Sequence, residues 1–356
     1  MLLFWQEGFL FSAGKFWLGL GLSALLVALF FVTVDVEHML DALSSANYLY
    51  VFPAVGLYLI GVVFRTMRWQ ALLRHIKHVS NRRLFPVVVI GYMANNLLPM
   101  RLGEVVRSYY LGEREQVSKS SALATIFIER VFDALTLLLF VALVALFVPV
   151  SGVAEGFGAQ WGIQPQLLAA GLSLPFVAAF IVMLLFSRWP GRTRALAMIV
   201  MKPLPSRFPH ARAMHIIDYF LTGFAPLSSL RMLGLLFALS VPVWAFEVGL
   251  FYLIGYSFGF HHIYDNPWHL VAAMALVTAL ANIGSSIPSS PGGIGLFELI
   301  ARETLVLLPL ATVARSDAAA FAAVSHFALL LPRIILGQVF LWAGNLSLRK
   351  LARAEG

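Results

Sequence analysis

The sequence lacks cysteine altogether and is poor in charged residues. Without cysteine, disulfide bonds and thiolate metal sites are excluded, and the redox environment of the chain stays undetermined. Charged residues make up 12% of the chain and hydrophobic residues 60%, whereas soluble domains average about 25% charged and about 45–50% apolar residues. The mean hydropathy is +0.85. This composition predicts a polytopic membrane protein.

Patterns of known catalytic and metal-binding chemistry are also missing. The sequence has no HExxH, no GxSxG and no Walker-type GK[ST] loop, so we expect no enzyme, no cofactor and no metal. His261, His262 and Asp265 are the one alternative, as ligands of a metal on the outer side. The formal charge of +8 comes from basic residues placed between hydrophobic runs. That placement is typical of loops that face anionic lipid, and we predict no nucleic-acid partner.

Hydrophobic runs predict about six full transmembrane helices in an all-α fold. The first run is long enough to span a bilayer and is followed by acidic "DVEHMLD" rather than a cleavage site, so we expect it to be retained. The predicted spans are 16–33, 48–64, 121–148, 167–187, 232–260 and 318–346.

The distribution of Lys and Arg orients these spans. Segments 65–83, 101–119 and 188–212 are rich in Lys and Arg, as is the C-terminus, so we place them in the cytoplasm. Loops 34–47 and 149–166 contain no Lys or Arg and are placed outside. We therefore predict a multi-pass protein of the cell (inner or plasma) membrane with a cytoplasmic C-terminus.

Two further apolar stretches are interrupted by Pro, Gly or Asn. Stretch 84–99 begins and ends on the cytoplasmic side, and stretch 268–310 begins and ends outside. The first is too short to cross twice, and the second has a Pro/Gly/Ser turn at its middle. We predict two re-entrant helical hairpins that enter the membrane from opposite faces.

The two hairpins also resemble each other. "MANNLLPMRLGEVVR" (93–107) and "LANIGSSIPSSPGGIGLFELIAR" (280–302) share Ala-Asn, an aliphatic-Pro pair, and Gly, Glu and Arg in the same order. An inverted repeat of 84–149 and 268–346 within a single membrane domain, 1–356, would place a substrate site near the midplane. The alternative is that the two breaks arose independently. The corresponding residues are Pro99, Gly103, Glu104 and Arg107, and Pro288, Gly295, Glu298 and Arg302.

Several charged residues lie inside predicted spans. "FIERVFD" places Glu129, Arg130 and Asp133 in span 121–148, with Arg130 able to reach Asp133 at helical spacing. Charges at a helix centre cost about 2.5–3.5 kcal/mol each on insertion scales, so these must face protein or a water-filled cavity. They form either a functional site or a structural ion-pair cluster. Helical spacing also predicts pairs of Glu104 with Arg107 and of Glu298 with Arg302.

Each of the remaining polar residues in the predicted spans has two possible roles. Arg333 either holds a phosphate or pairs with Glu129 or Asp133. His326 is either a proton carrier, because histidine titrates near neutral pH, or a packed side chain that donates to a backbone carbonyl. Glu247 is either an arginine partner or a titrating acid.

The "SSIPSSPGGIG" turn exposes several backbone N–H groups. At the start of a helix near Ile294, such a nest attracts an anion, and Ser289 and Ser290 add hydroxyl donors. The alternative is a tight turn that packs closely through its glycines. Asn95 and Asn96 hold the equivalent place in the first hairpin.

The segments "NNLLPMRLGEVVRSYYL", "ATIFIERVFD" and "SSIPSSPGGIGLFE" resemble the lysylphosphatidylglycerol synthase transmembrane family, and the resemblance covers roughly residues 10–346. It implies a lipid translocase that moves an anionic or modified phospholipid, or a polyprenyl-phosphate-linked lipid. The sequence ends at Gly356, so we expect a stand-alone member without the soluble synthase domain. By motif match, the resemblance implies functional roles for Arg101, Glu104, Arg130, Asp133, Pro291, Gly292, Gly293 and Glu298.

Together these observations predict a transporter that moves an anionic lipid headgroup across the membrane, with proton coupling as an option. The alternatives are a membrane-embedded transferase or hydrolase that acts on a lipid-linked substrate, and an assembly partner of a cell-envelope biosynthesis enzyme. The oligomeric state is left open. The predicted proton-coupling residues are Glu129, Glu247 and His326. The predicted substrate-binding residues are Asn95, Asn96, Arg101, Glu104, Arg130, Asp133, Ser289, Ser290, Gly292, Gly293, Glu298 and Arg333.

Overall fold

The computed structural model describes Gly21, Leu25, Ala28 and residues 30–98, 102–203, 209–286 and 291–344. Within these residues all regular structure is helical and no strand occurs, which confirms the all-α prediction. The elements are α3 (Val36–Ser45), η2 (Tyr48–Tyr50), α4 (Val51–Leu73), α5 (Asn81–Leu97), α6 (Gly103–Glu115), α7 (Lys119–Ala145), α8 (Ser151–Trp161), α9 (Pro165–Arg188), α10 (Pro190–Met201), α11 (His210–Phe224), η4 (Ala225–Ser228), α12 (Leu230–Ser257), η5 (Phe260–His262), α13 (Pro267–Gly284), η6 (Pro291–Gly293), α14 (Leu296–Leu307) and α15 (Arg315–Ala343).

Five stretches of the described chain are helical and apolar over enough residues to cross a membrane. This fits a polytopic membrane protein. Helix α7 has 27 residues, but Glu129, Arg130 and Asp133 interrupt its apolar surface. Much of the predicted span 16–33 falls outside the described residues, so the number of spans stays a prediction. The five stretches are Tyr48–Leu73, Pro165–Arg188, Leu230–Ser257, Pro267–Gly284 and Arg315–Ala343.

The segments that we expected to be loops contain helices of their own. Loop 34–47 holds α3, and loop 149–166 holds α8. The basic segment 188–212 holds α10 and the start of α11. We assigned these segments as loops because none has a hydrophobic run long enough to span a membrane. A short helix does not need a run of that length.

Helices α5 and α6 form a tight helical hairpin. The prediction that stretch 84–99 holds both arms was wrong, because α5 runs unbroken through Leu97 and the second arm, α6, comes from segment 101–119. Leu98 adopts an extended conformation after α5, as a residue before proline prefers, and this ends the helix. The two helices then pack backbone against backbone, because a Cβ added at Gly103 would lie 2.1 Å from the Gly91 carbonyl oxygen. The same Cβ would lie 2.5 Å from the backbone nitrogen of Asn95. Gly103 thus permits the close contact at the tip of this hairpin.

Helices α13 and α14 form a second hairpin with a glycine-rich tip. Gly292, Gly293 and Gly295 have φ values of 67°, 77° and 90°, a region that L side chains rarely adopt. At the tip, a Cβ on Gly292 would lie 3.5 Å from the carbonyl oxygen of Asn96 in the first hairpin. The tips of the two hairpins therefore meet.

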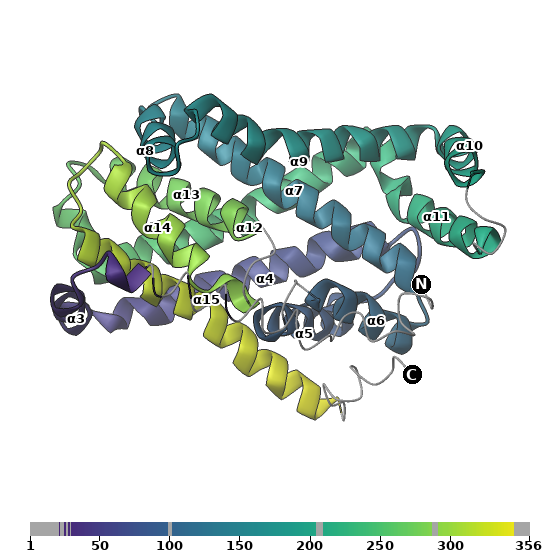
Figure 1. Ribbon diagram of the computed structural model, residues 1–356. Coiled ribbons are helices and arrows are strands. Elements are labelled where there is room, and N and C mark those ends of the chain that lie inside the picture. Colours follow the sequence, from purple (N-terminus) through teal and green to yellow (C-terminus); the bar gives the residue numbers. More distant parts are fainter. Residues whose placement is uncertain are drawn as a thin grey trace.

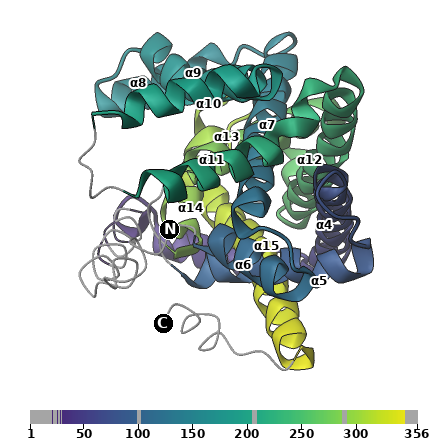
Figure 2. The ribbon, with the colours of Figure 1, turned by 90° about the vertical axis from the view of Figure 1, so that its right-hand side faces the viewer.

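The remaining helices enclose these two tips. Helix α15 packs against both α5 and α14, and α12 packs along α4. Helix α7 runs diagonally between the hairpins and the layer that contains α8 and α9 (Figure 1). Figure 2 shows α8, α9 and α10 along one side of the molecule, away from α5 and α15. At the described tip ends, Asn95, Asn96 and Gly292 are partly buried, whereas Leu97 and Ile294 are exposed.

The contact at Gly103 leads to a stability prediction. Gly103→Ala would push a methyl group into backbone atoms that cannot yield without parting α5 from α6, and we expect a loss of about 1–3 kcal/mol. Gly56→Ala is the matched control, because nothing lies within 4 Å of a Cβ at that position in α4. There the change should raise stability by up to about 1 kcal/mol through helix propensity. Thermal unfolding in detergent micelles measures both, and equal melting temperatures would contradict the close packing.

Candidate functional site

A cavity of about 660 Å³ lies where the two hairpin tips meet. Asn95 and Asn96 reach it from the first hairpin, and Gly292 and Gly293 from the second. Helices α4, α7, α9, α12 and α15 also contribute to its walls. The sequence prediction that both hairpins contribute to one site is thus in accord with this cavity.

The two sides of the cavity differ in chemistry. Phe127 and Leu137 of α7 and Leu172, Pro175 and Phe176 of α9 provide an apolar wall. The polar and charged lining residues come from the hairpins and from α4, α7, α12, α13 and α15. They are Arg65, Tyr92, Asn95, Asn96, Glu104, Arg130, Asp133, Trp244, Asn282, Ser285, Ser286, His326 and Arg333.

Asp133 is the centre of a network of buried ion pairs. Its carboxylate lies 2.8 Å from Nη2 of Arg68, 3.1 Å from Nη2 of Arg130 and 3.7 Å from Nη1 of Arg65. The expected contact between Arg130 and Asp133 is confirmed. The pairs link α4 to α7 across the protein interior, because Arg65 and Arg68 belong to α4.

Glu129 and Glu247 extend this network away from the cavity. Glu129 lies 2.8 Å from Nη1 of Arg107 and 3.7 Å from Nη2 of Arg68. Glu247 accepts from Arg65 at 2.9 Å and from the Asn282 amide at 2.9 Å. Both carboxylates are almost fully buried, and neither is among the residues that line the cavity. For these two acids the structure shows the arginine-partner arrangement that the sequence left as one of two options.

Three arginines of the network were not predicted to be buried. Arg65 and Arg68 were counted with the basic cytoplasmic segment 65–83, and Arg107 with segment 101–119, but all three are buried. For Arg65 and Arg68 the predicted end of span 48–64 was too early, because α4 continues through Leu73. The apolar "WQALL" that follows Arg68 was the available signal.

The two predicted intrahelical Glu-to-Arg pairs are also replaced by other partners. Arg107 pairs with Glu129 of α7 and not with Glu104, which lies 3.7 Å from Nε of Arg130. Arg302 pairs with its neighbour Glu303 at 2.7 Å. Helical spacing makes such pairs feasible, but for Arg107 a buried carboxylate on a neighbouring helix competes more strongly because water is absent. For Arg302 the competing carboxylate is the next residue of its own helix.

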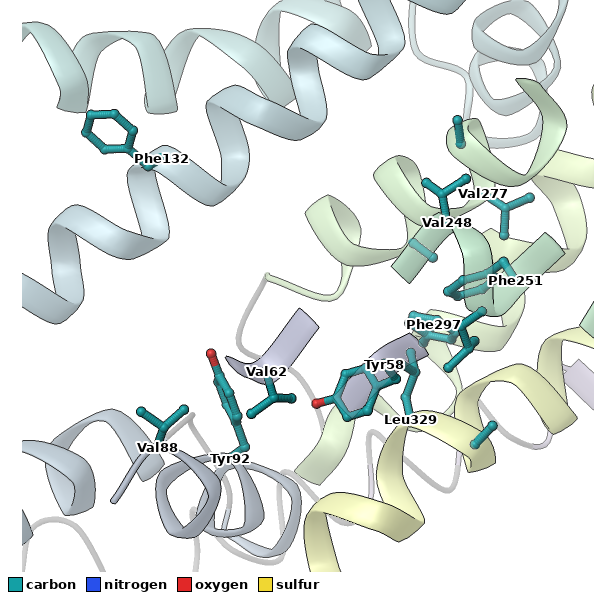
Figure 3. Packing of buried hydrophobic residues seen from close by; sticks show 14 of the residues in the cluster. Tyr58, Val62, Val88, Tyr92, Phe132, Val248, Phe251, Val277, Phe297 and Leu329 are labelled. Carbon is teal, nitrogen blue, oxygen red and sulfur yellow. The ribbon is translucent and has the colours of Figure 1, made fainter. Parts of the chain in front are cut away.

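Arg333 differs from the other arginines of the cavity. Its Nε donates to the hydroxyl of Tyr58, and its guanidinium lies 4.9 Å from the Tyr58 ring centroid and 5.6 Å from that of Tyr92. In the part of the chain that the structure describes, no carboxylate lies within ion-pair distance of Arg333, so the expected pairing with Glu129 or Asp133 does not occur. Figure 3 shows the Tyr58 hydroxyl directed toward Tyr92.

His326 connects the second hairpin tip with α14. Its Nδ1 lies 2.6 Å from Glu298 Oε1, and its Nε2 lies 3.1 Å from the carbonyl oxygen of Gly292. The contact with a backbone carbonyl agrees with the packed-histidine reading. Glu298 also accepts from the backbone N–H of Gly295 at 2.7 Å, so the start of α14 is capped by its own side chain and not left open for an anion. Glu298 itself is not among the cavity-lining residues.

Some polar atoms at the cavity lack a hydrogen-bond partner among the described residues. They are Oδ1 of Asn95, Nδ2 of Asn96 and the hydroxyl of Tyr92. Tyr92 was not a predicted site residue, because an aromatic side chain in an apolar stretch carries no polar signal in the sequence. Arg101, Ser289 and Ser290 lie outside the described residues. No group of three or more His, Asp or Glu positioned to hold a metal occurs in the described part.

Comparison with known proteins agrees with this architecture. Residues 16–337 match the family described as the lysylphosphatidylglycerol synthase TM region. The chain belongs to this family. The match includes the segments that contain both hairpins and most of α15.

Individual relatives come from archaea. A UPF0104 membrane protein of Methanothermobacter thermautotrophicus is 31% identical over 72% of this chain and 74% of its own length. The glycosyltransferase AglD of Haloferax volcanii is 24% identical over 86% of this chain, and the match spans 51% of AglD. The chain thus corresponds to about half of that glycosyltransferase.

The buried network gives a second prediction. Glu129→Gln should cost about 3–5 kcal/mol, because it leaves the buried Arg107 without a compensating charge. In a double-mutant cycle with Arg107→Gln, we expect a coupling of about 2 kcal/mol. The exposed pair Glu113 and Lys119, at 2.6 Å, is the control, and its coupling should stay below about 1 kcal/mol. Unfolding in mixed detergent micelles measures these values. Similar coupling energies for the buried and the exposed pair would contradict a network that excludes water.

Proposed function

We propose that this protein moves an anionic lipid headgroup across the membrane, and that the lipid is a phospholipid or a polyprenyl-phosphate lipid. The observation that carries this proposal is Arg333, which faces the cavity without a carboxylate partner in the described structure. An arginine with free guanidinium N–H groups binds phosphate oxygens in a bidentate manner. Arg130, which is 22% exposed at the same cavity, provides a second cation.

The hydrogen-bonding groups around Arg333 suit a phosphate. The Tyr92 hydroxyl and Nδ2 of Asn96 are donors without partners among the described residues, and both residues line the cavity. Buried donors of this kind are costly unless something accepts from them. A phosphate between Arg333 and Arg130 would accept from both.

The apolar wall supports a lipid rather than a free phosphate compound. Phe127 is 44% exposed although it lines the cavity, as expected where the wall continues to the outer, lipid-facing surface of α7. An acyl or prenyl chain can follow this wall while its headgroup stays on the polar side. The family to which the chain belongs is consistent with a lipid substrate.

Our proposal includes hairpins that enter from opposite faces. Arg74, Lys77, Arg82 and Arg83 lie around the base of the first hairpin, so this base is placed in the cytoplasm. Irregular backbone at membrane depth is tolerated where protein or a polar cavity surrounds it, which describes both tips. In this arrangement, a site between two repeats near the midplane can open to either side in turn.

Cysteine labelling tests the opposed hairpins directly, because the chain has no cysteine. Glu113→Cys marks the base of α6, and Trp268→Cys, whose side chain is 79% exposed, marks the base of α13. In intact cells, a membrane-impermeant maleimide should label position 268, and position 113 should react only after the membrane is opened. Labelling of both positions from the same side would refute the opposed entry.

Lipid movement tests the proposed function. In proteoliposomes that contain fluorescent NBD-phosphatidylglycerol, the wild-type protein should increase the fraction of probe that external dithionite reduces, compared with empty vesicles. Arg333→Gln should lower the rate by about tenfold or more, because one charge-assisted contact contributes about 1.5–3 kcal/mol. The rate of Arg333→Lys should fall between those of the wild type and Arg333→Gln, since lysine keeps the positive charge but cannot make the bidentate contact of a guanidinium group.

Arg231→Gln is the matched control, since Arg231 is exposed at the start of α12 and away from the cavity. Its rate should stay within about twofold of the wild type. Equal rates for the two glutamine variants would refute the site. Turnover of a lipid-linked substrate in detergent, without two compartments, would instead favour a transferase or hydrolase. Movement only beside a co-purifying cell-envelope enzyme would favour an assembly partner.

A further inference from the structure

His326 has oxygen acceptors on both ring nitrogens. Nδ1 lies 2.6 Å from a carboxylate oxygen of Glu298, and Nε2 lies 3.1 Å from the backbone carbonyl oxygen of Gly292. A neutral imidazole has one N–H donor, whereas the charged imidazolium has two. Nε2 must carry a proton to donate to Gly292, because a carbonyl has none. A second proton is needed between Nδ1 and Oε1 of Glu298, whose other oxygen accepts from Gly295 N–H. The observed geometry is therefore satisfied only when the His326–Glu298 pair carries two protons, and with Glu298 ionised both lie on the ring.

We propose that His326 is a proton-binding site that latches the tip of the second hairpin. With the ring charged, Nε2–H holds Gly292, and Nδ1–H holds Glu298 at the start of α14. The latch joins η6, α14 and α15 at one point. Its role in lipid movement rests on the proposed function, but the latch itself does not.

Loss of one proton breaks the contact with Gly292. The Glu298 contact is the shorter of the two and joins opposite charges, so Nδ1 keeps its proton. Nε2 then presents a lone pair to the carbonyl oxygen of Gly292, and the two repel. The Phe297 ring stacks on the imidazole at 4.2 Å and limits its rotation, so the tip has to move.

The released segment is the one that touches the first hairpin. Gly292 lies against Asn96, and both residues line the cavity. A shift of Gly292 would open the seam between the hairpin tips. A proton on His326 thus favours the closed seam that the structure shows.

Other charged groups around the cavity bias this proton. The positive charges of Arg333 and Arg130 oppose it, and an anionic headgroup between them would favour it, so proton and headgroup binding should reinforce each other. Glu247 of α12 is held by Arg65 and Asn282, and α3 contributes no charged residue to the cavity lining within the described chain. The titratable or charged groups of the lining besides His326 are Arg65 (α4), Tyr92 (α5), Glu104 (α6), Arg130 and Asp133 (α7), and Arg333 (α15).

Nitrogen-15 NMR of the full chain with labelled histidine tests the protonation. The chain has nine histidines, and His326→Gln assigns the resonance by its loss. At about pH 5 the two ring nitrogens should both show imidazolium shifts, and one should change at higher pH. A single neutral tautomer throughout the range from about pH 5 to about pH 8 would overturn the proposal. Apart from the assignment, this measurement uses only the wild-type protein.

Fluorine NMR tests the movement of the tip. A trifluoromethyl tag on Ile294→Cys reports beside η6, and Leu230→Cys at the exposed start of α12 is the control position. The latched signal at position 294 should fall about tenfold between about pH 5 and about pH 8, while the control signal stays constant. In His326→Ala, the position-294 signal should be unlatched at every pH, because no side-chain N–H is left to hold Gly292.

The outcomes separate this inference from the proposed function. A pH-independent tip signal in the wild type, or a latched signal that persists unchanged in His326→Ala, would refute the latch even if NBD-phosphatidylglycerol moves. A proton-linked tip in a protein that moves no lipid would support the latch and refute the proposed function.

Discussion

The burial of three carboxylates among arginines is the constraint on which the rest of this structure depends. Asp133, Glu129 and Glu247 lie where water cannot solvate them, so each requires a cationic partner from a neighbouring helix. Arg65 and Arg68 of α4 and Arg107 of α6 meet this requirement. These pairs fix how α4, α6, α7 and α12 stand relative to one another. A shift of any one helix would leave an uncompensated charge in the interior.

Saturation of the acids has a consequence for the cavity. Asp133 and Glu247 are already surrounded by Arg65, Arg68 and Arg130, so the described structure leaves no acid for Arg333. Tyrosine rings and a tyrosine hydroxyl surround Arg333 instead, and they shield the guanidinium without neutralising it. An anion that entered the cavity would therefore meet a positive charge that is partly buried and already oriented. For the headgroup that we propose, binding there would need little reorganisation.

The described backbone departs from the helix at both hairpin tips, at Leu98 in the first and at Gly292 in the second. Backbone without helical hydrogen bonds is stable in a membrane protein only where other groups satisfy it or a polar cavity surrounds it. Glycine at position 103 allows the two helices of the first hairpin to approach more closely than any side chain would permit. In our proposal, His326 adds a contact to Gly292 that depends on one proton.

The sequence by itself determined the all-α membrane class, both helix breaks and the presence of charges inside α7, because apolar runs, Pro/Gly interruptions and intramembrane charges are local signals. It also identified Arg130 with Asp133, a pair within one helix. Only the tertiary structure decided which arginines balance Glu129 and Glu247, and that Tyr92 and Asn282 line the cavity. It also decided that Arg333 has no carboxylate partner among the described residues. These depend on contacts between helices far apart in the chain, and the strength of a buried ion pair depends on distance and desolvation, which no spacing in the sequence encodes.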